Sequence, residues 1–106
     1  MSFGVMGGQM QPQGHAQMVT RIVDWRQNPQ AASDGPRWIV NADFSVSFES
    51  SRFAPGVLDE LASRGHRIVD PEAAMFGFGG AQLIWRFEDG YCAGSDHRKD
   101  GHAIGF

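Results

Sequence analysis

Two consecutive glycines, Gly7 and Gly8, are the residues of this chain best suited to do chemistry with the main chain. They follow a short apolar run and precede a helical pattern, within the stretch FGVMGGQMQPQGHAQ at residues 3–17. Glycine has no side chain to keep a ligand away from the backbone, so a pair at a strand end can direct bare N–H groups at an anion or an oxyanion. A tight turn between a strand and a helix also needs glycine, and from spacing alone that is the commoner explanation.

No candidate nucleophile in the sequence looks activated. Thr20 falls within a predicted helix, Ser33 lies at a helix end or turn, and no GxSxG or Ser-x-x-Lys motif surrounds Ser33 or Ser95. Cys92 is the one cysteine, so an intrachain disulfide is impossible, and it falls within a predicted strand, where an inert buried thiol is the commoner case. The sequence therefore offers no activated nucleophile to accompany the glycine pair.

The histidines and the second glycine cluster predict no metal and no cofactor. Gly77, Gly79 and Gly80 lack the GxGxxG spacing and precede a predicted strand, so a glycine-rich loop is the simpler interpretation. No histidine pairs at helical or finger spacing, and no second cysteine supports a metal site. A local cluster of titratable residues, which a solvated loop explains as well, consists of Asp96, His97, Asp100 and His102.

Length and charge narrow the class of protein. At 106 residues with 42% hydrophobic content, we expect residues 1–106 to form a single domain with a small core. The net charge is −3 and the basic residues are scattered, which predicts no nucleic-acid partner and no membrane surface. The opening MSFGVMGGQM has neither the basic residues of a signal peptide nor the length of a membrane span.

The elements that flank the paired glycines are predicted from apolar periodicity. Residues 3–6 are expected to end a buried strand, and a helix is expected from Gln13 to Gln27. Asn28 and Pro29 suit the cap and first position of a second short helix that ends near Ser33. The expected buried face of the first helix consists of Met18, Val19, Ile22, Val23 and Trp25.

The rest of the chain predicts more strands than helices. Residues 37–40 and 44–50 are expected to form a hairpin around 41–43, with Phe44, Val46 and Phe48 alternating with polar residues. A helix after Pro55 is predicted to end before Gly65, with Val57, Leu58, Leu61 and Ala62 on its apolar face. The later predicted segments are a glycine-rich loop at 76–80 and strands at 66–69, 81–87 and 91–94, the last two joined at Glu88-Asp89-Gly90.

This order of elements has no regular βαβ alternation. It therefore predicts an α+β fold, with a mostly antiparallel sheet and helices packed on one face.

Four separated motifs together resemble the C-terminal end of the gamma-glutamyltranspeptidase family, over essentially the whole chain and in the same order. They are FGVMGGQMQPQGHAQ, NPQAASDGPRW, ELASRGHRI and AQLIWRFEDGYCAGSDHRKDGHAIGF. NPQAASDGPR is similar to a family helix and turn. Gly94-Ser95-Asp96 with Arg98 is similar to the family's last loop.

The resemblance implies a piece of an N-terminal-nucleophile (Ntn) hydrolase with an αββα sandwich. Members are precursors that cut themselves before a threonine, and the freed threonine attacks the gamma-glutamyl amide of glutathione and related compounds. The family's oxyanion donors match Gly7 and Gly8. The threonine and the glutamate-binding segments would lie upstream, so the 106 residues alone are expected to be inactive, with the large subunit and the rest of the small subunit as partners.

The sequence also departs from the family in ways that keep alternatives open. Met6 stands where proline is commoner, and the MQPQGH-like stretch resembles a subgroup whose substrates need not be glutathione. A related amide acylase is one alternative, and a free-standing binding module that kept the fold without catalysis is another. A fragment cut from a sandwich would expose an apolar face, so we expect self-association.

Overall fold

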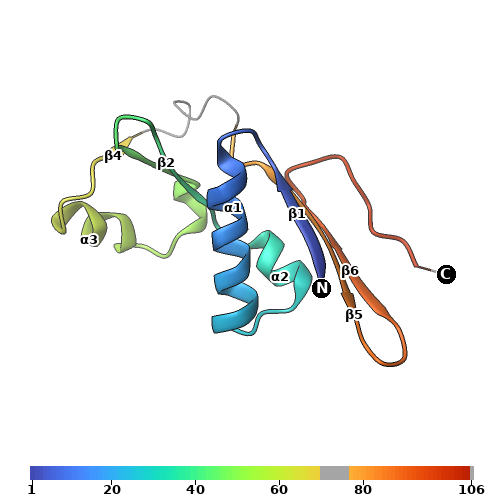
Figure 1. The fold of residues 1–106 in the computed structure, drawn as a ribbon. Helices are drawn as coiled ribbons and strands as arrows, with labels where there is room; N and C mark the ends of the chain where they lie inside the picture. Colours follow the sequence, from blue (N-terminus) through green and yellow to red (C-terminus); the bar gives the residue numbers. More distant parts are fainter. Residues whose placement is uncertain (70–76, 106) are drawn as a thin grey trace. The chain divides into compact units, whose positions relative to one another are not determined.

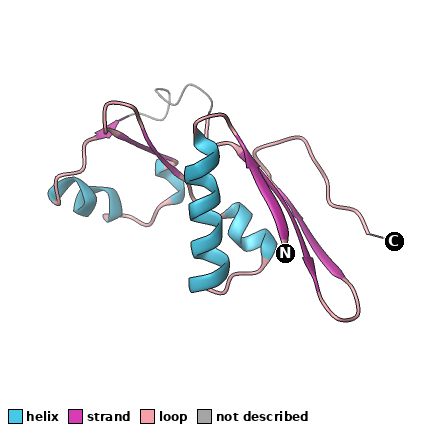
Figure 2. Cartoon of the chain, in the orientation of Figure 1, coloured by secondary structure: helices cyan, strands magenta, loops and turns pink. Residues whose placement is uncertain are grey.

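The computed structural model describes residues 1–69 and 77–105 (Figure 1). The chain forms two compact units, the first of Met1–Gly35 with Gly79–Phe106 and the second of Pro36–Phe78. Helices and mainly antiparallel strands occur together, as Figure 2 shows, so the predicted α+β class is confirmed.

The first unit contains a three-stranded antiparallel sheet. Its strands are β1 (Ser2–Met6), β5 (Gly80–Arg86) and β6 (Tyr91–Ser95), in the order β1-β5-β6. Val5 lies opposite Ala81 in the register between β1 and β5. The predicted strands are therefore present to within a residue or two, and β5 and β6 form the predicted hairpin.

Helix α1 (Met10–Val19) follows the paired glycines directly. It begins three residues before the predicted Gln13, because the amides of Met10 and Gln11 already donate to the carbonyls of Gly7 and Gly8, at 3.0 and 3.1 Å. Pro12 lies in the first helical turn, where an amide has no intrahelical acceptor and its loss costs little. The helix and the glycine turn are thus one continuous structure.

Helix α2 (Pro29–Asp34) begins as the sequence predicts. The Asn28 side chain accepts a hydrogen bond from the Ala31 amide at 2.8 Å, and Pro29 occupies the first helical position. Each feature satisfies or removes a backbone donor that a helix start leaves unpaired.

The predicted end of the first helix is wrong. Residues Thr20–Asp24 form a π-helical turn, η1, closed by a 3.1 Å hydrogen bond from the Trp25 amide to the Thr20 carbonyl. The wider turn shifts the phase of the side chains, so Val23 and Trp25 are each 64% exposed instead of buried. Arg21 is buried in their place and donates to two carbonyls of the α2 segment.

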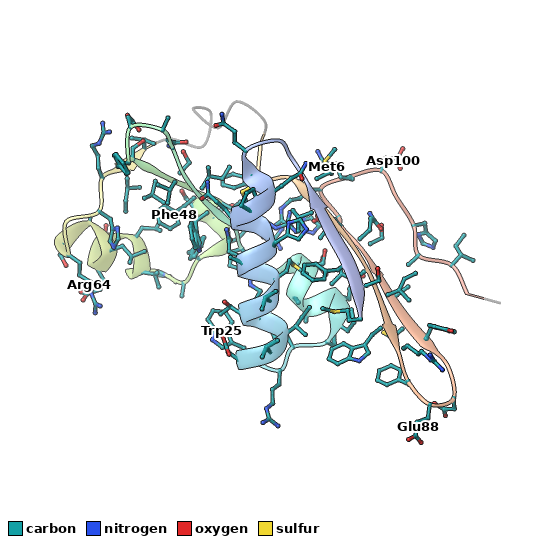
Figure 3. All side chains as sticks on the ribbon, viewed as in Figure 1. Met6, Trp25, Phe48, Arg64, Glu88 and Asp100 are labelled. Carbon is teal, nitrogen blue, oxygen red and sulfur yellow. The ribbon has the colours of Figure 1, made fainter. Side chains whose placement is uncertain are left out.

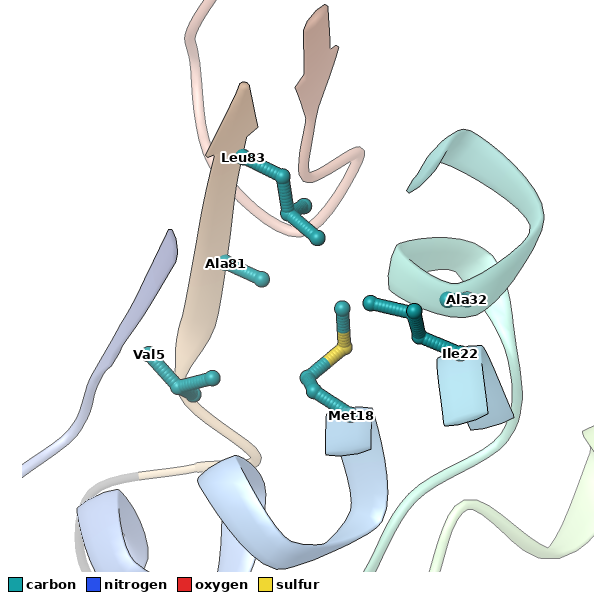
Figure 4. Packing of buried hydrophobic residues seen from close by; sticks show 6 residues of the cluster. All are labelled: Val5, Met18, Ile22, Ala32, Ala81 and Leu83. Atoms are coloured by element: carbon teal, nitrogen blue, oxygen red, sulfur yellow. The ribbon is translucent and has the colours of Figure 1, made fainter. Parts of the chain in front are cut away.

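The core of the first unit lies between the sheet and the helices on one of its faces. Figure 4 shows strand residues projecting toward helix residues across this layer. The buried cluster consists of Val5, Ala81 and Leu83 from the strands and Met18, Ile22 and Ala32 from the helical segments. This arrangement fixes the end of β1, and hence the glycine turn, against α1.

The second unit has its own three-stranded sheet. Strand β2 (Trp38–Val40) pairs antiparallel with β3 (Val46–Phe48), and β3 pairs in parallel with β4 (Ile68–Val69). The short 3₁₀ turn η2 (Ser50–Arg52) and helix α3 (Val57–Ser63) connect β3 to β4. The strands therefore divide between two sheets, whereas the sequence pattern suggests one.

The predicted alternation over 44–50 is partly wrong. Phe44 has a φ of +61° and is 83% exposed, and strand geometry is confined to Val46–Phe48. Ser45 and Ser47 are buried because their hydroxyls accept hydrogen bonds from the Asn41 side chain, at 2.9 and 3.1 Å. The hairpin loop thus provides hydrogen bonds to two buried serine hydroxyls, whereas the alternating pattern predicts that both serines face solvent.

The apolar face predicted for α3 is only half-buried within this unit. Leu58 and Leu61 are half-buried, whereas Val57 and Ala62 are exposed. The start of the predicted loop at 76–80 lies outside the described residues.

Candidate functional site

Gly7 and Gly8 form the turn that joins β1 to α1. Their φ angles are +142° and +58°, a region that side-chain-bearing residues rarely adopt. Met6, labelled in Figure 3, marks the end of the strand before this turn. Because both glycine carbonyls accept the first amides of α1, the turn is fixed by the helix start.

The two glycine N–H groups are not engaged by the described part of the chain. Gly7 is half-buried and Gly8 is exposed, and neither amide donates a hydrogen bond to any of the described residues. They lie at the N-terminus of a ten-residue helix, where the helix dipole favours negative charge. The turn can therefore stabilise charge that develops on an oxygen atom.

Gly79, which directly precedes β5, packs closely against the Gly7 turn. A Cβ built on Gly7 would lie 3.0 Å from the Cα of Gly79 and 3.2 Å from the Cβ of Met10. Gly79 has a φ of +72°, and a Cβ there would collide with the carbonyl oxygen of Met6. Gly79 is thus required for close packing against the turn, a role that its spacing did not reveal.

Asp96 secures the start of β5, the strand that follows Gly79. Asp96 is only 1% exposed. Its carboxylate accepts a 2.7 Å hydrogen bond from the Ala81 amide and forms an ion pair with Arg98 at 3.1 Å. Arg98 also donates to the carbonyls of Ser33 and Gly35, both at 3.0 Å. The last loop therefore ties the start of β5 to the end of α2.

The predicted titratable cluster of the last loop does not form a metal site. His97 lies 3.0 Å from the Asp34 carboxylate, while the Asp96 carboxylate is hydrogen-bonded to the Ala81 amide. No group of three or more potential metal ligands occurs in the described part of the chain. The described helices also include none with the length and apolarity needed to cross a membrane.

Three of the four candidate nucleophiles have no base beside them among the described residues, and the fourth is buried. Ser33 is fully buried in α2. Thr20 lies in the π-helical turn, Cys92 is half-buried within β6, and Ser95 ends that strand. None of the last three side chains hydrogen-bonds to a base within residues 1–69 and 77–105.

These features define a class of protein before any comparison is made. The chain has an α+β fold in which a strand, a glycine turn and a helix start leave two backbone N–H groups without a hydrogen-bond acceptor among the described residues.

The whole chain, residues 1–106, matches the family model described as Gamma-glutamyltranspeptidase. The protein belongs to this family.

Two curated relatives are proenzymes. The glutathione hydrolase-like YwrD proenzyme of Bacillus subtilis (strain 168) is 32% identical, over 97% of this chain and 21% of its own length. The oxamate amidohydrolase proenzyme of Klebsiella pneumoniae subsp. pneumoniae is 33% identical, over 100% of this chain and 21% of its own length. The chain thus spans about a fifth of the length of these relatives.

A solved structure agrees with the family. The cephalosporin acylase from Bacillus halodurans is 42% identical, with a TM-score of 0.78, over 94% of this chain and 19% of that one. The fold is therefore part of the Ntn-hydrolase architecture shared by transpeptidases and acylases of this family, as the resemblance implied.

Proposed function

We propose that this chain is the C-terminal part of the small subunit of an amide-cleaving Ntn hydrolase, and that Gly7 and Gly8 are its oxyanion donors. The observation that carries this proposal is the pair of unengaged N–H groups at the start of α1. The family membership supplies the reaction for which such donors are needed.

The chemistry assigns the chain one part of an acyl transfer. The hydroxyl oxygen of an N-terminal threonine outside these residues attacks the amide carbonyl carbon, and its proton passes to the threonine's own α-amine. The carbonyl electron pair moves onto oxygen, where the N–H groups of Gly7 and Gly8 donate. Collapse breaks the C–N bond, the amine leaves with the proton, and water or an acceptor amine then attacks the ester to restore the threonine.

The proposed substrates are gamma-glutamyl amides of the glutathione type. The relatives support a wider choice, because they include an oxamate amidohydrolase and a cephalosporin acylase as well as a glutathione hydrolase-like protein. Comparing kcat/KM of the complete enzyme for a gamma-glutamyl anilide, oxamate and a cephalosporin side-chain amide tests this proposal. A preference for either of the last two by tenfold or more, about 1.4 kcal/mol, would assign the enzyme to the acylases or amidohydrolases.

The proposed partners are the rest of the small subunit and the large subunit. The sheet face opposite the helices, which we call the outer face, carries Met6, Ile84 and Tyr91, all at least half exposed. Exposed apolar surface of this kind is normally covered by a further layer. We propose that the second sheet of the αββα sandwich covers it in the complete enzyme.

An activity assay can compare the 106 residues alone with the complete enzyme. We expect the 106 residues alone to leave a gamma-glutamyl anilide intact, because the nucleophile is elsewhere, whereas the complete enzyme cleaves it. Turnover by the purified chain that disappears on replacement of Thr20, Ser33, Ser95 or Cys92 would contradict the proposal.

A further inference from the structure

His15 connects the two arms of the glycine turn. It lies on α1, and its Nε2 atom accepts a 3.4 Å hydrogen bond from the Val5 amide of β1. Its Nδ1 atom lies 2.6 Å from the carbonyl oxygen of Gln11 in the first turn of the helix. The imidazole therefore contacts the strand two residues before Gly7 and the helix three residues after Gly8.

The two contacts together fit a single neutral tautomer of the ring. A carbonyl oxygen only accepts hydrogen bonds, so Nδ1 must carry the proton that is shared with Gln11. Nε2 is then unprotonated and can accept from the Val5 amide. A neutral ring with its proton on Nδ1 satisfies both contacts, whereas the tautomer with its proton on Nε2 satisfies neither.

The helix lies close enough for this contact because residue 14 is glycine. A Cβ built on Gly14 would lie 2.6 Å from Cγ1 of Val5, so any larger residue would push α1 away from β1. The imidazole also packs against the ring of Phe3, with centroids 5.3 Å apart. Gly14 and His15 thus hold α1 on β1 at the level of the turn.

We infer that His15 is a positioning residue for the oxyanion donors, acting as a neutral Nδ1–H imidazole that clamps β1 to the first turn of α1. This inference rests on the proposed role of Gly7 and Gly8. Without these contacts the end of β1 and the start of α1 can move relative to each other. The N–H groups of Gly7 and Gly8, which lie between them, would then no longer point at the same oxygen atom. Preorganised donors of this kind contribute only when they are aligned on the developing oxyanion.

The tautomer is tested without any activity measurement. Long-range ¹H–¹⁵N NMR of the complete enzyme labelled with ¹⁵N-histidine, at about pH 8.5, where an imidazole is neutral, reports which ring nitrogen is protonated. The Nδ1–H form, together with slow exchange of the Val5 amide, is the expected result. The Nε2–H form would overturn the inference even if the protein is an active amidohydrolase.

The positioning role is tested by kinetics of the complete enzyme. His15→Phe keeps the ring packing and removes both nitrogens, and we expect kcat to fall about fivefold to tenfold while KM changes less than about twofold. His15→Gln keeps a side-chain acceptor for the Val5 amide and should recover most of kcat. His66→Phe, at an exposed histidine of the second unit, is the matched control and should leave kcat unchanged.

The outcomes separate this inference from the proposed function. An unchanged kcat in a folded His15→Phe enzyme would refute the positioning role and leave the donors' role intact. A complete enzyme without amidase activity would refute the proposed function, and the NMR result would still decide the tautomer.

Discussion

Gly7→Ala in the complete enzyme displaces one of the two proposed oxyanion donors without removing any polar atom. The added Cβ would lie 3.0 Å from the Gly79 backbone, closer than ordinary van der Waals contact, and 3.2 Å from Met10. The native φ of +142° is also strained for alanine, at a cost of about 1–3 kcal/mol. The turn must therefore rearrange, and the direction of its N–H groups changes with it.

The expected effect follows from the cost of losing one aligned donor. Loss of a single oxyanion donor typically lowers kcat by about 10²- to 10³-fold, or about 2.7–4 kcal/mol. KM should change little, because the donors act mainly on the transition state. Steady-state hydrolysis of a gamma-glutamyl anilide measures both constants, and circular dichroism checks that the variant is folded.

Gly4→Ala provides the matched control. Gly4 lies in β1, and a Cβ there meets nothing within 4 Å. We expect its kcat to stay within about twofold of the parent value, since no donor moves. A folded Gly7→Ala enzyme with the same kcat as Gly4→Ala would refute the argument and leave the paired glycines as a turn alone.

Three further predictions concern stability and assembly. Asp96→Asn should lower the free energy of unfolding, measured by urea denaturation, by about 3–5 kcal/mol, because it leaves Arg98 buried without its counter-charge. A urea midpoint equal to that of the exposed-site control Asp100→Asn would contradict this. Hydrogen bonds from Ser45 lower the Asp43 pKa from 3.8 to about 2, so the charge stabilises the fold above about pH 4 and this effect is lost as pH falls through about 2. Asp43→Asn should therefore be less stable than the parent at pH 7 in thermal unfolding, with a difference that shrinks below about pH 4 and is lost well below about pH 2. A difference that stays constant over this whole range would exclude the charge as the cause. The isolated chain should self-associate through its outer face at tens of micromolar in sedimentation, where a single monomeric species would count against an uncovered sheet.

The sequence predicts the local elements well where one physical signal dominates. The change from a strand to a helical period around Gly7 and Gly8 places the turn, and Asn28-Pro29 gives α2 its cap and first residue. Glu88-Asp89-Gly90 likewise predicts the hairpin, which is closed by a 2.8 Å hydrogen bond from the Phe87 amide to the Gly90 carbonyl. These features depend on neighbours within a few residues.

The features that the sequence missed depend on distant contacts. The π-helical turn at Thr20–Asp24 places Arg21 against carbonyls more than ten residues away, and apolar spacing contains no sign of this. Gly79 approaches Met6 only because β5 pairs with β1. The contact between the His15 ring and the Val5 amide is likewise visible only in the folded chain. Gly14, the small residue before His15, is a sequence signal for close packing of the helix.

The most direct test of the central claim is a crystal structure of the complete enzyme trapped as an acyl-enzyme on its nucleophile. We expect the acyl carbonyl oxygen to lie about 2.7–3.1 Å from the amide nitrogens of both Gly7 and Gly8. A carbonyl oxygen directed elsewhere, with both glycine amides facing solvent, would contradict it.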